Sequence, residues 1–386
     1  MRVRVSGAAL ISMFILAACG GSSPGAGHTP AASTSAVTTS TATPSTGTTP
    51  STTSSPGPAS LVHCATAVPA GDNLVIGTVV GDPTVVVRDI QDPANAKNLC
   101  TFDTSAISPQ FVSASAVAYV TQDTQIVEAQ LAGGPTALIA TFGGGVVSSG
   151  QFAISPDGRS MTYLDVNAWH LVGPSGNRVL TTLPAVPGRG VNPDEDDSFL
   201  SYSPDGQYIA LFQTFHVGGS GETAPDQIRR ASDGSLVYST SGMTMAVWAS
   251  VPSRLFFRDS SGNVHRWDPS TGLSSMTSLR WIRPHSSPDG RWIAYTFRTP
   301  SGLGGVGFYS VQSNSVSNTS PPGRSGVKFL TNDLVWYAGE KACTTTCIQP
   351  QPTGVTYIYS IAGISEVTSR LASVNDAWPH VTAPGL

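Results

Sequence analysis

Charged side chains are scarce in this sequence of 386 residues: they make up 11 %, against roughly 25 % in an average soluble domain. Lysine is the rarest of them, with only Lys97, Lys328 and Lys341. The formal net charge of −4 provides no basic field for nucleic-acid phosphates, so a nucleic-acid-binding function is excluded. The sequence is instead rich in Gly (40) and Pro (29), which argues against a mainly helical protein because both residues disfavour helix interiors.

The start of the chain lacks an apolar run long enough to span a bilayer. The run Ala8–Ala18 has 11 residues, against the roughly 20 that a transmembrane helix needs, and it follows a short positive segment with Arg2 and Arg4. Charge and length together are typical of a signal peptide over residues 1–18. The sequence Leu16-Ala17-Ala18-Cys19-Gly20, at its end, resembles the lipobox of bacterial lipoproteins.

The resemblance to the lipobox implies that Cys19 is lipidated, becomes the first residue and anchors an exported protein in the membrane. Two or more acyl chains on one residue hold a protein stably, because each buried CH₂ contributes about 0.8 kcal/mol. The alternative is an ordinary secretory signal followed by a chance Cys. Either interpretation places the mature protein outside the cytoplasm.

Residues 20–60 contain no Asp, Glu, Lys or Arg, while Ser and Thr fill 21 of the 41 positions and Pro six. Such a segment cannot bury enough apolar surface to offset the entropy lost on ordering, so we expect 19–60 to be a disordered linker. It would act as a tether that separates a folded domain, 61–386, from the membrane.

Four cysteines remain once Cys19 is assigned to lipid, and an even number in an exported protein favours disulfides. Their positions in the sequence suggest the pairs Cys64–Cys100 and Cys343–Cys347. Metal binding by the four is disfavoured because neither pair has the C-x-x-C spacing of zinc sites.

A repeat organises the chain after residue 60. The motif Ser-Pro-Asp-Gly occurs at Ser155–Gly158, Ser203–Gly206 and Ser287–Gly290, with separations of 48 and 84 residues. Weaker copies begin at Val68, Val112, Ser250 and Leu330. Pro, Asp and Gly in this order favour a tight turn, and the residues that follow are those of a buried strand. A period of about 37 to 48 residues without helical segments predicts the blades of a β-propeller.

At these motifs the sequence resembles the TolB-like and WD40-like (PD40-type) propeller repeats of bacteria, although the additional N-terminal domain of TolB has no counterpart here. We expect an all-β propeller with seven blades, and six or eight blades are the alternatives. Strands B to D of the blades are predicted over 73–103, 117–142, 161–183, 208–240, 254–279, 293–319 and 334–370. The segment Trp378–Thr382 is predicted to be a last A strand that pairs near Asn73–Val79 and closes the first blade.

Antiparallel geometry predicts that the Ser-Pro-Asp-Gly turns lie on one face of the propeller, and that the loops entering strand A lie on the other. Trp281, His285, Trp378 and His380 precede or begin A strands, so they are predicted to surround the channel mouth on that second face. His216 lies in a long loop of the same face. These five residues are the candidate ligand-binding residues, and packing or hydrogen bonding is the alternative role for the histidines.

The acidic run Asp194, Glu195, Asp196 and Asp197 is the one candidate metal site, for a structural Ca²⁺. It lacks the spaced D-x-D-x-D-G pattern, which favours a solvated loop, and no other cofactor is expected.

No convincing catalytic set occurs. The sequence therefore predicts a non-catalytic binding or scaffolding module for an envelope protein, peptide or glycan. The alternative is an exported hydrolase or lyase with its site at the channel mouth.

Overall fold

The computed structural model describes twelve stretches of the chain: residues 58–65, 67–68, 73–93, 96–122, 124–141, 152–164, 168–182, 198–213, 226–250, 252–276, 279–342 and 350–377. The predicted signal peptide, Cys19 and nearly all of the linker lie outside these residues. Within them every regular element is a strand, and no helix long and apolar enough to cross a membrane is present.

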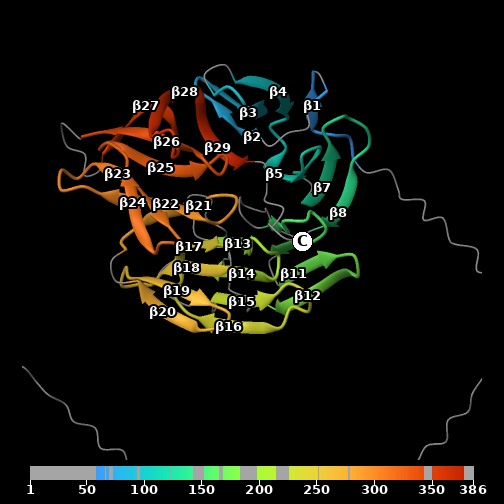
Figure 1. Cartoon of the computed structure of the whole chain (residues 1–386). Coiled ribbons are helices and arrows are strands. Elements are labelled where there is room, and N and C mark those ends of the chain that lie inside the picture. Colours follow the sequence, from blue (N-terminus) through green and yellow to red (C-terminus); the bar gives the residue numbers. More distant parts are fainter. Residues whose placement is uncertain are drawn as a thin grey trace, which may run out of the picture. The chain divides into compact units, whose positions relative to one another are not determined.

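The strands form seven antiparallel sheets, the blades of a propeller (Figure 1). From the axis outwards, blade one contains β29 (Leu371–Ala377), β2 (Leu74–Val79), β3 (Asp82–Asp89), β4 (Lys97–Phe102) and β1 (Val62–Cys64). Blade two contains β5 (Ile107–Ser113), β6 (Ala116–Val120), β7 (Gln125–Gln130) and β8 (Ala137–Thr141). Blade three contains β9 (Phe152–Ile154), β10 (Met161–Leu164), β11 (Ala168–Gly173) and β12 (Gly176–Thr182).

The other four blades have the same order of four strands. Blade four contains β13 (Ser198–Tyr202), β14 (Tyr208–Gln213), β15 (Asp226–Arg230) and β16 (Leu236–Thr240). Blade five contains β17 (Thr244–Ala249), β18 (Arg254–Arg258), β19 (Val264–Asp268) and β20 (Gly272–Met276). Blade six contains β21 (Ile282–Ser286), β22 (Trp292–Arg298), β23 (Gly304–Ser310) and β24 (Ser315–Thr319). Blade seven contains β25 (Arg324–Phe329), β26 (Leu334–Lys341), β27 (Gln351–Ser360) and β28 (Ser365–Ser369).

The predicted seven-bladed architecture is confirmed, and the predicted strand sets agree with the structure to within three residues at each end. The Ser-Pro-Asp-Gly turns explain this accuracy. In the turn of blade three, the Ser155 hydroxyl donates to Asp157 Oδ1 at 2.6 Å and accepts from Ser160 N–H at 2.9 Å. Gly158 takes a φ of 68°, a conformation that Gly adopts without strain. The motif therefore fixes the turn with its own side chains, and the Asp residues are turn formers as predicted.

The last strand closes the ring, but it is not the predicted segment. Strand β29 pairs with β2, with Val75 opposite Ala377 and Thr78 opposite Ser373. The partner was predicted correctly, whereas the closing strand begins seven residues before Trp378. Only Arg370 separates β28 from β29, and Leu371 is buried in the seam that β29 closes. Leu371 is therefore an apolar residue that the closing strand buries, and the predicted segment Trp378–Thr382 lies outside the described residues.

The segment after the linker adds a fifth, outermost strand to blade one. Strand β1 pairs with β4, and Cys64 lies opposite Cys100 in the ladder with 4.0 Å between their Cα atoms. The predicted Cys64–Cys100 disulfide is present and fastens the start of the domain to this outer edge. Cys343 and Cys347 lie outside the described residues.

The core of the molecule lies between the blades. The buried apolar side chains form seven clusters, and each cluster takes residues from two neighbouring blades. The seventh joins the last blade to the first, through Leu330 and Trp336 of blade seven and Val75 and Leu371 of blade one. Closure of the ring thus buries one more apolar seam as well as pairing two strand edges.

Candidate functional site

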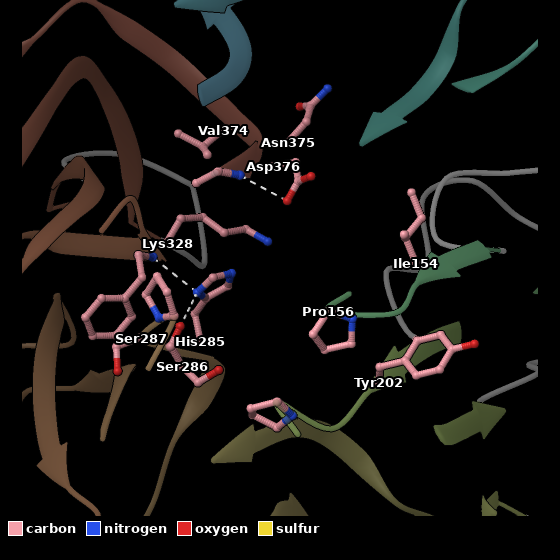
Figure 2. A pocket seen from close by; sticks show the side chains of 14 residues that line it. Ile154, Pro156, Tyr202, His285, Ser286, Ser287, Lys328, Val374, Asn375 and Asp376 are labelled. Atoms are coloured by element: carbon pink, nitrogen blue, oxygen red, sulfur yellow. Dashed lines mark hydrogen bonds between the residues drawn. The ribbon is translucent and has the colours of Figure 1, made fainter. Parts of the chain in front are cut away.

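A cavity of about 260 Å³ lies among the C-terminal ends of the inner strands (Figure 2). Its lining comes from β9, β13, β21, β25 and β29 and from the turns that follow three of them. Pro156, Pro204 and Pro288 of the three Ser-Pro-Asp-Gly turns are part of the wall. The cavity therefore lies on the axial side of the blades, at the face of these turns.

His285 supplies one polar group of the cavity. Its ring Nδ1 lies 3.2 Å from the Phe329 backbone nitrogen of blade seven, whose N–H points at it, and 3.1 Å from the Ser286 carbonyl oxygen. Burial, and next the nearby Lys328 cation, lower the pKa of His285 from 6.5 to about 3. The ring is therefore neutral at pH 7, and Figure 2 shows its Nε2 edge pointing into the cavity.

Asp376 and Lys328 bring opposite charges to the same wall. The Phe111 backbone N–H of blade two donates to Asp376 Oδ2 at 2.7 Å, and the Ala377 N–H donates to Oδ1 at 3.0 Å. These bonds hold the carboxylate at the end of β29. In Figure 2 the Lys328 side chain extends from β25 into the cavity, between His285 and Asp376. The site thus combines a cation, a carboxylate and a neutral imidazole.

Tyr202 lines the opposite side of the cavity with its ring rather than with its hydroxyl. Figure 2 shows the hydroxyl directed away from His285, and it is buried without a hydrogen-bond partner. Burial, and next the Asp157 carboxylate, raise the pKa of Tyr202 well above 10. The hydroxyl therefore stays protonated, and Tyr202 contributes an apolar surface together with Ile154.

Of the predicted ligand-binding and metal-binding residues, the structure describes only Trp281 and His285, and it places only His285 at the cavity. Trp281 is 1 % exposed and packs between blades five and six, with its ring centroid 5.9 Å from that of Tyr295 and 6.1 Å from that of Phe256. It is a core residue because an indole at the start of strand A fits the seam. His216, Trp378 and His380 lie outside the described residues, as do Asp194, Glu195, Asp196 and Asp197.

The predicted face is also wrong for His285. This residue is the fourth of five in β21 and immediately precedes the Ser286-Ser287-Pro288 turn, so it lies at the end of strand A. The D–A loop enters β21 at its other end. A hydrogen-bonding role was the alternative interpretation of the sequence, and His285 has a partner in the Phe329 N–H as well as a place in the cavity lining.

Two charged lining residues were not among the sequence candidates, although one had a usable signal. Lys328 stands two residues before Leu330, where a weak repeat copy begins, and His285 stands two residues before Ser287 of a strong copy. The equal offset places both at the end of strand A. Asp376 had no such signal, because no turn motif follows the closing strand. Among the residues that the structure describes, no cluster of three or more His, Cys, Asp or Glu side chains could hold a metal ion.

No known family model matches the sequence, and no curated protein matches it. Among solved structures, the chain is similar to the oligogalacturonate lyase VPA0088 from Vibrio parahaemolyticus, with a TM-score of 0.51 and 11 % identity over 81 % of this chain and 86 % of the lyase. The putative TolB from Agrobacterium tumefaciens gives 0.39 and 15 % over 70 % and 84 % of the two chains. The β-propeller domain of Cps50 (Swd1) from Myceliophteria thermophila gives 0.44 and 13 % over 73 % and 93 %. At such low identity, the likeness shows the β-propeller fold alone.

Proposed function

We propose that the chain is an exported lipoprotein, anchored to the membrane through Cys19, whose propeller binds an envelope protein, peptide or glycan without altering it chemically. The lipobox-like sequence and the charge-free linker support the location. The mixed polar lining of the axial cavity supports the binding role and is the observation on which the proposal depends.

The cavity offers several kinds of contact within a small volume. Lys328 can pair with a carboxylate or a carbonyl oxygen, Asp376 can accept from an amide or a hydroxyl, and His285 Nε2 can form one hydrogen bond. Peptides and glycans carry all of these groups. A volume of about 260 Å³ is slightly below that of a typical small-molecule site, so the cavity would admit one side chain or one sugar residue of a larger ligand.

The chemistry of His285 supports binding rather than turnover. An efficient general acid or base has a pKa near the working pH, and the pKa of His285 is about 3. Its Nδ1 is already engaged by the Phe329 N–H and the Ser286 carbonyl oxygen, which leaves only Nε2 for a ligand. Burial likewise keeps the Tyr202 hydroxyl protonated, and this hydroxyl is directed away from the cavity.

Fractionation tests the location. The wild-type protein is expected in the membrane fraction, and the Cys19→Ala variant is expected in the soluble fraction or as unprocessed precursor. An unmodified Cys19 in the intact mass of the mature protein would contradict the anchor.

Capture from solubilised envelopes tests the binding role. Asn375 is exposed and lines the cavity, so Asn375→Trp should fill it without disturbing the core. Gln312→Trp, in the exposed turn between β23 and β24, is the matched control. We expect the same envelope component with the wild type and the control, and its loss with Asn375→Trp. Equal recovery from all three proteins would contradict the proposal, and chemical change of the captured ligand would favour the exported hydrolase or lyase.

A further inference from the structure

A second cavity, of about 400 Å³, lies along blade one and the link from blade seven. It is lined by Val79, Arg88, Ala96, Lys97, Asn98 and Arg370. Three of these side chains are cationic and none is acidic, in a chain whose net charge is −4 and whose lysines number three. Such a concentration of positive charge has to be neutralised either by acidic side chains of the protein or by a bound anion.

Arg88 is the least expected residue of this group because it is only 6 % exposed. It lies on β3 two residues before Ile90, hence on the same face of the sheet, and Ile90 belongs to the apolar cluster between blades one and seven. The guanidinium donates one hydrogen bond from Nη2 to the Ala96 carbonyl. Its Nε is buried and has no hydrogen-bond partner, and a buried charged group without full pairing is costly.

Within the described part of the chain, no carboxylate lies within ion-pair distance of these cations. None of its ion pairs includes Arg88, Lys97 or Arg370. Asp89 lies opposite Lys97 in the β3–β4 ladder, but its Oδ1 accepts from the Gln91 N–H and caps the following turn. Burial, and next the charge of Arg370, lower the pKa of Arg88, so the two guanidinium groups repel each other across the cavity.

We propose that this cavity binds a phosphate-type oxyanion between Arg88, Lys97 and Arg370. A guanidinium presents parallel N–H donors that match the oxygens of a phosphate, and an anion here would neutralise cations that form no ion pair among the described residues. Three cations without a carboxylate favour a doubly charged anion over a single carboxylate. The site is separate from the axial cavity and does not depend on the function proposed for it.

The position of Arg370 links this anion to the closure of the ring. Arg370 immediately precedes β29, and its carbonyl accepts the Val80 N–H at 2.9 Å. An anion held by Arg370 together with Arg88 and Lys97 would connect the start of the closing strand to β3 and β4. Because only the folded propeller assembles the three cations, anion binding stabilises it against unfolding.

Calorimetric titration of the purified full-length protein with sodium phosphate at constant ionic strength tests the site. Arg370→Gln removes an exposed cation of the cavity, and Arg280→Gln removes an exposed arginine elsewhere as the matched control. Loss of one charged contact should weaken the phosphate Kd by about 10- to 100-fold in Arg370→Gln, whereas Arg280→Gln should bind like the wild type. No phosphate binding by the wild type, or equal Kd values for the two variants, would overturn the proposal.

Thermal unfolding gives an independent measurement. Phosphate at ten times its Kd should raise the Tm of the wild type by about 2–4 °C relative to chloride at the same ionic strength. Arg88→Met retains most of the side-chain volume and removes the buried charge, so its Tm should no longer respond to phosphate. A purely structural arginine would leave the phosphate response of the variant unchanged, and that result would also overturn the site.

A phosphodiester probe distinguishes the sources of the anion. Glycerophosphoglycerol carries the headgroup of an anionic phospholipid without its acyl chains, so the lipid anchor does not complicate the titration. Binding at least as tight as that of inorganic phosphate would assign the site to a lipid headgroup, and weaker binding would assign it to free phosphate or a phosphate monoester. Binding of neither probe would contradict the proposal.

Discussion

Individual polar residues near the axis hold neighbouring blades together and also face the cavity. Asp376 of blade one accepts the Phe111 N–H of blade two, and His285 of blade six accepts the Phe329 N–H of blade seven. A backbone N–H left without its acceptor at such a seam costs about 1–3 kcal/mol. Substitutions that probe ligand binding at these two residues must therefore be read together with stability.

The stability of the propeller should depend on the protonation of His285. The pKa of His285 is about 3 in the folded state and 6.5 in the unfolded chain, so the unfolded state binds more protons between these values. The free energy of unfolding should fall as the pH drops from 6.5 towards 3. Between pH 7 and pH 5 the contribution of this partly buried group is about 1–2 kcal/mol.

The variant His285→Asn isolates this contribution because Asn has no titrating group and can keep an acceptor for the Phe329 N–H. Urea unfolding at pH 7 and pH 5 should show a smaller loss of stability in the variant than in the wild type. An equal loss in both proteins would show that His285 is not held neutral.

The sequence could predict His285 as a candidate site residue, but not the face of the propeller on which it lies. The turn motif after Ser286 correctly indicated where strand A ends. The predicted face was wrong because His285 was assigned to the loop that enters strand A rather than to the end of the strand. Trp281 was assigned to the channel because it recurs at Trp378, but a large apolar ring is also what the seam between blades needs. Lys328 and Asp376 are single charged residues in inner strands, and only the folded ring shows that they meet.

The closing strand is the element on which the fold depends most, and it was the hardest to delimit from the sequence. Each other A strand precedes a copy of the turn motif, whereas the sequence after β29 contains no such copy. Its signal is limited to Leu371 and Val374, which enter the seam with blade seven. The pairing of β29 with β2 is nevertheless tight, because Gly77 has no side chain at the point where the two backbones approach.

Gly77→Ala should disrupt this pairing. A Cβ at residue 77 would lie 2.1 Å from the Ser373 carbonyl oxygen, and a backbone atom of the closing strand cannot move aside freely. We expect a loss of about 1–3 kcal/mol in urea unfolding. Gly173→Ala is the control, because its Cβ would meet only the rotatable Ser160 hydroxyl at 3.1 Å. Equal stabilities of the two variants would argue against a tight β2–β29 contact.

The outer edge of blade one depends on the disulfide. Cys64 and Cys100 are 36 residues apart, and a crosslink of this length restricts the unfolded chain. The double variant Cys64→Ala/Cys100→Ala should lose about 2–4 kcal/mol of unfolding free energy. Peptide mapping without reductant checks the bond itself, and free thiols at both positions in exported protein would contradict it.

At the scale of the whole molecule, the ring has seven seams and each one is apolar. The repeat spacing, the turn chemistry and the lack of an A strand before the first set of strands were sufficient to predict this architecture from the sequence. They could not predict the two cavities, because each is lined by residues from different blades or from the link between them.

Removal of the closing strand should affect the entire propeller rather than one blade. Deletion of residues 371–386 removes β29 and opens the seam that contains Trp336 and Val75, and it exposes the edge of β2. We expect insoluble or protease-sensitive protein, while deletion of residues 20–57 should leave the propeller folded. A truncated protein that melts like the full chain would show that closure by β29 is dispensable.

The central claim is that the axial cavity holds a ligand in the envelope, and site-specific photocrosslinking tests it most directly. Benzoylphenylalanine is introduced at Asn375 in the cavity or at Gln312 in the distant turn, in full-length protein within intact cells. Irradiation should produce a discrete higher-mass adduct from the probe at Asn375 and none from the probe at Gln312. The same adducts from both positions, or no adduct from Asn375, would contradict the account.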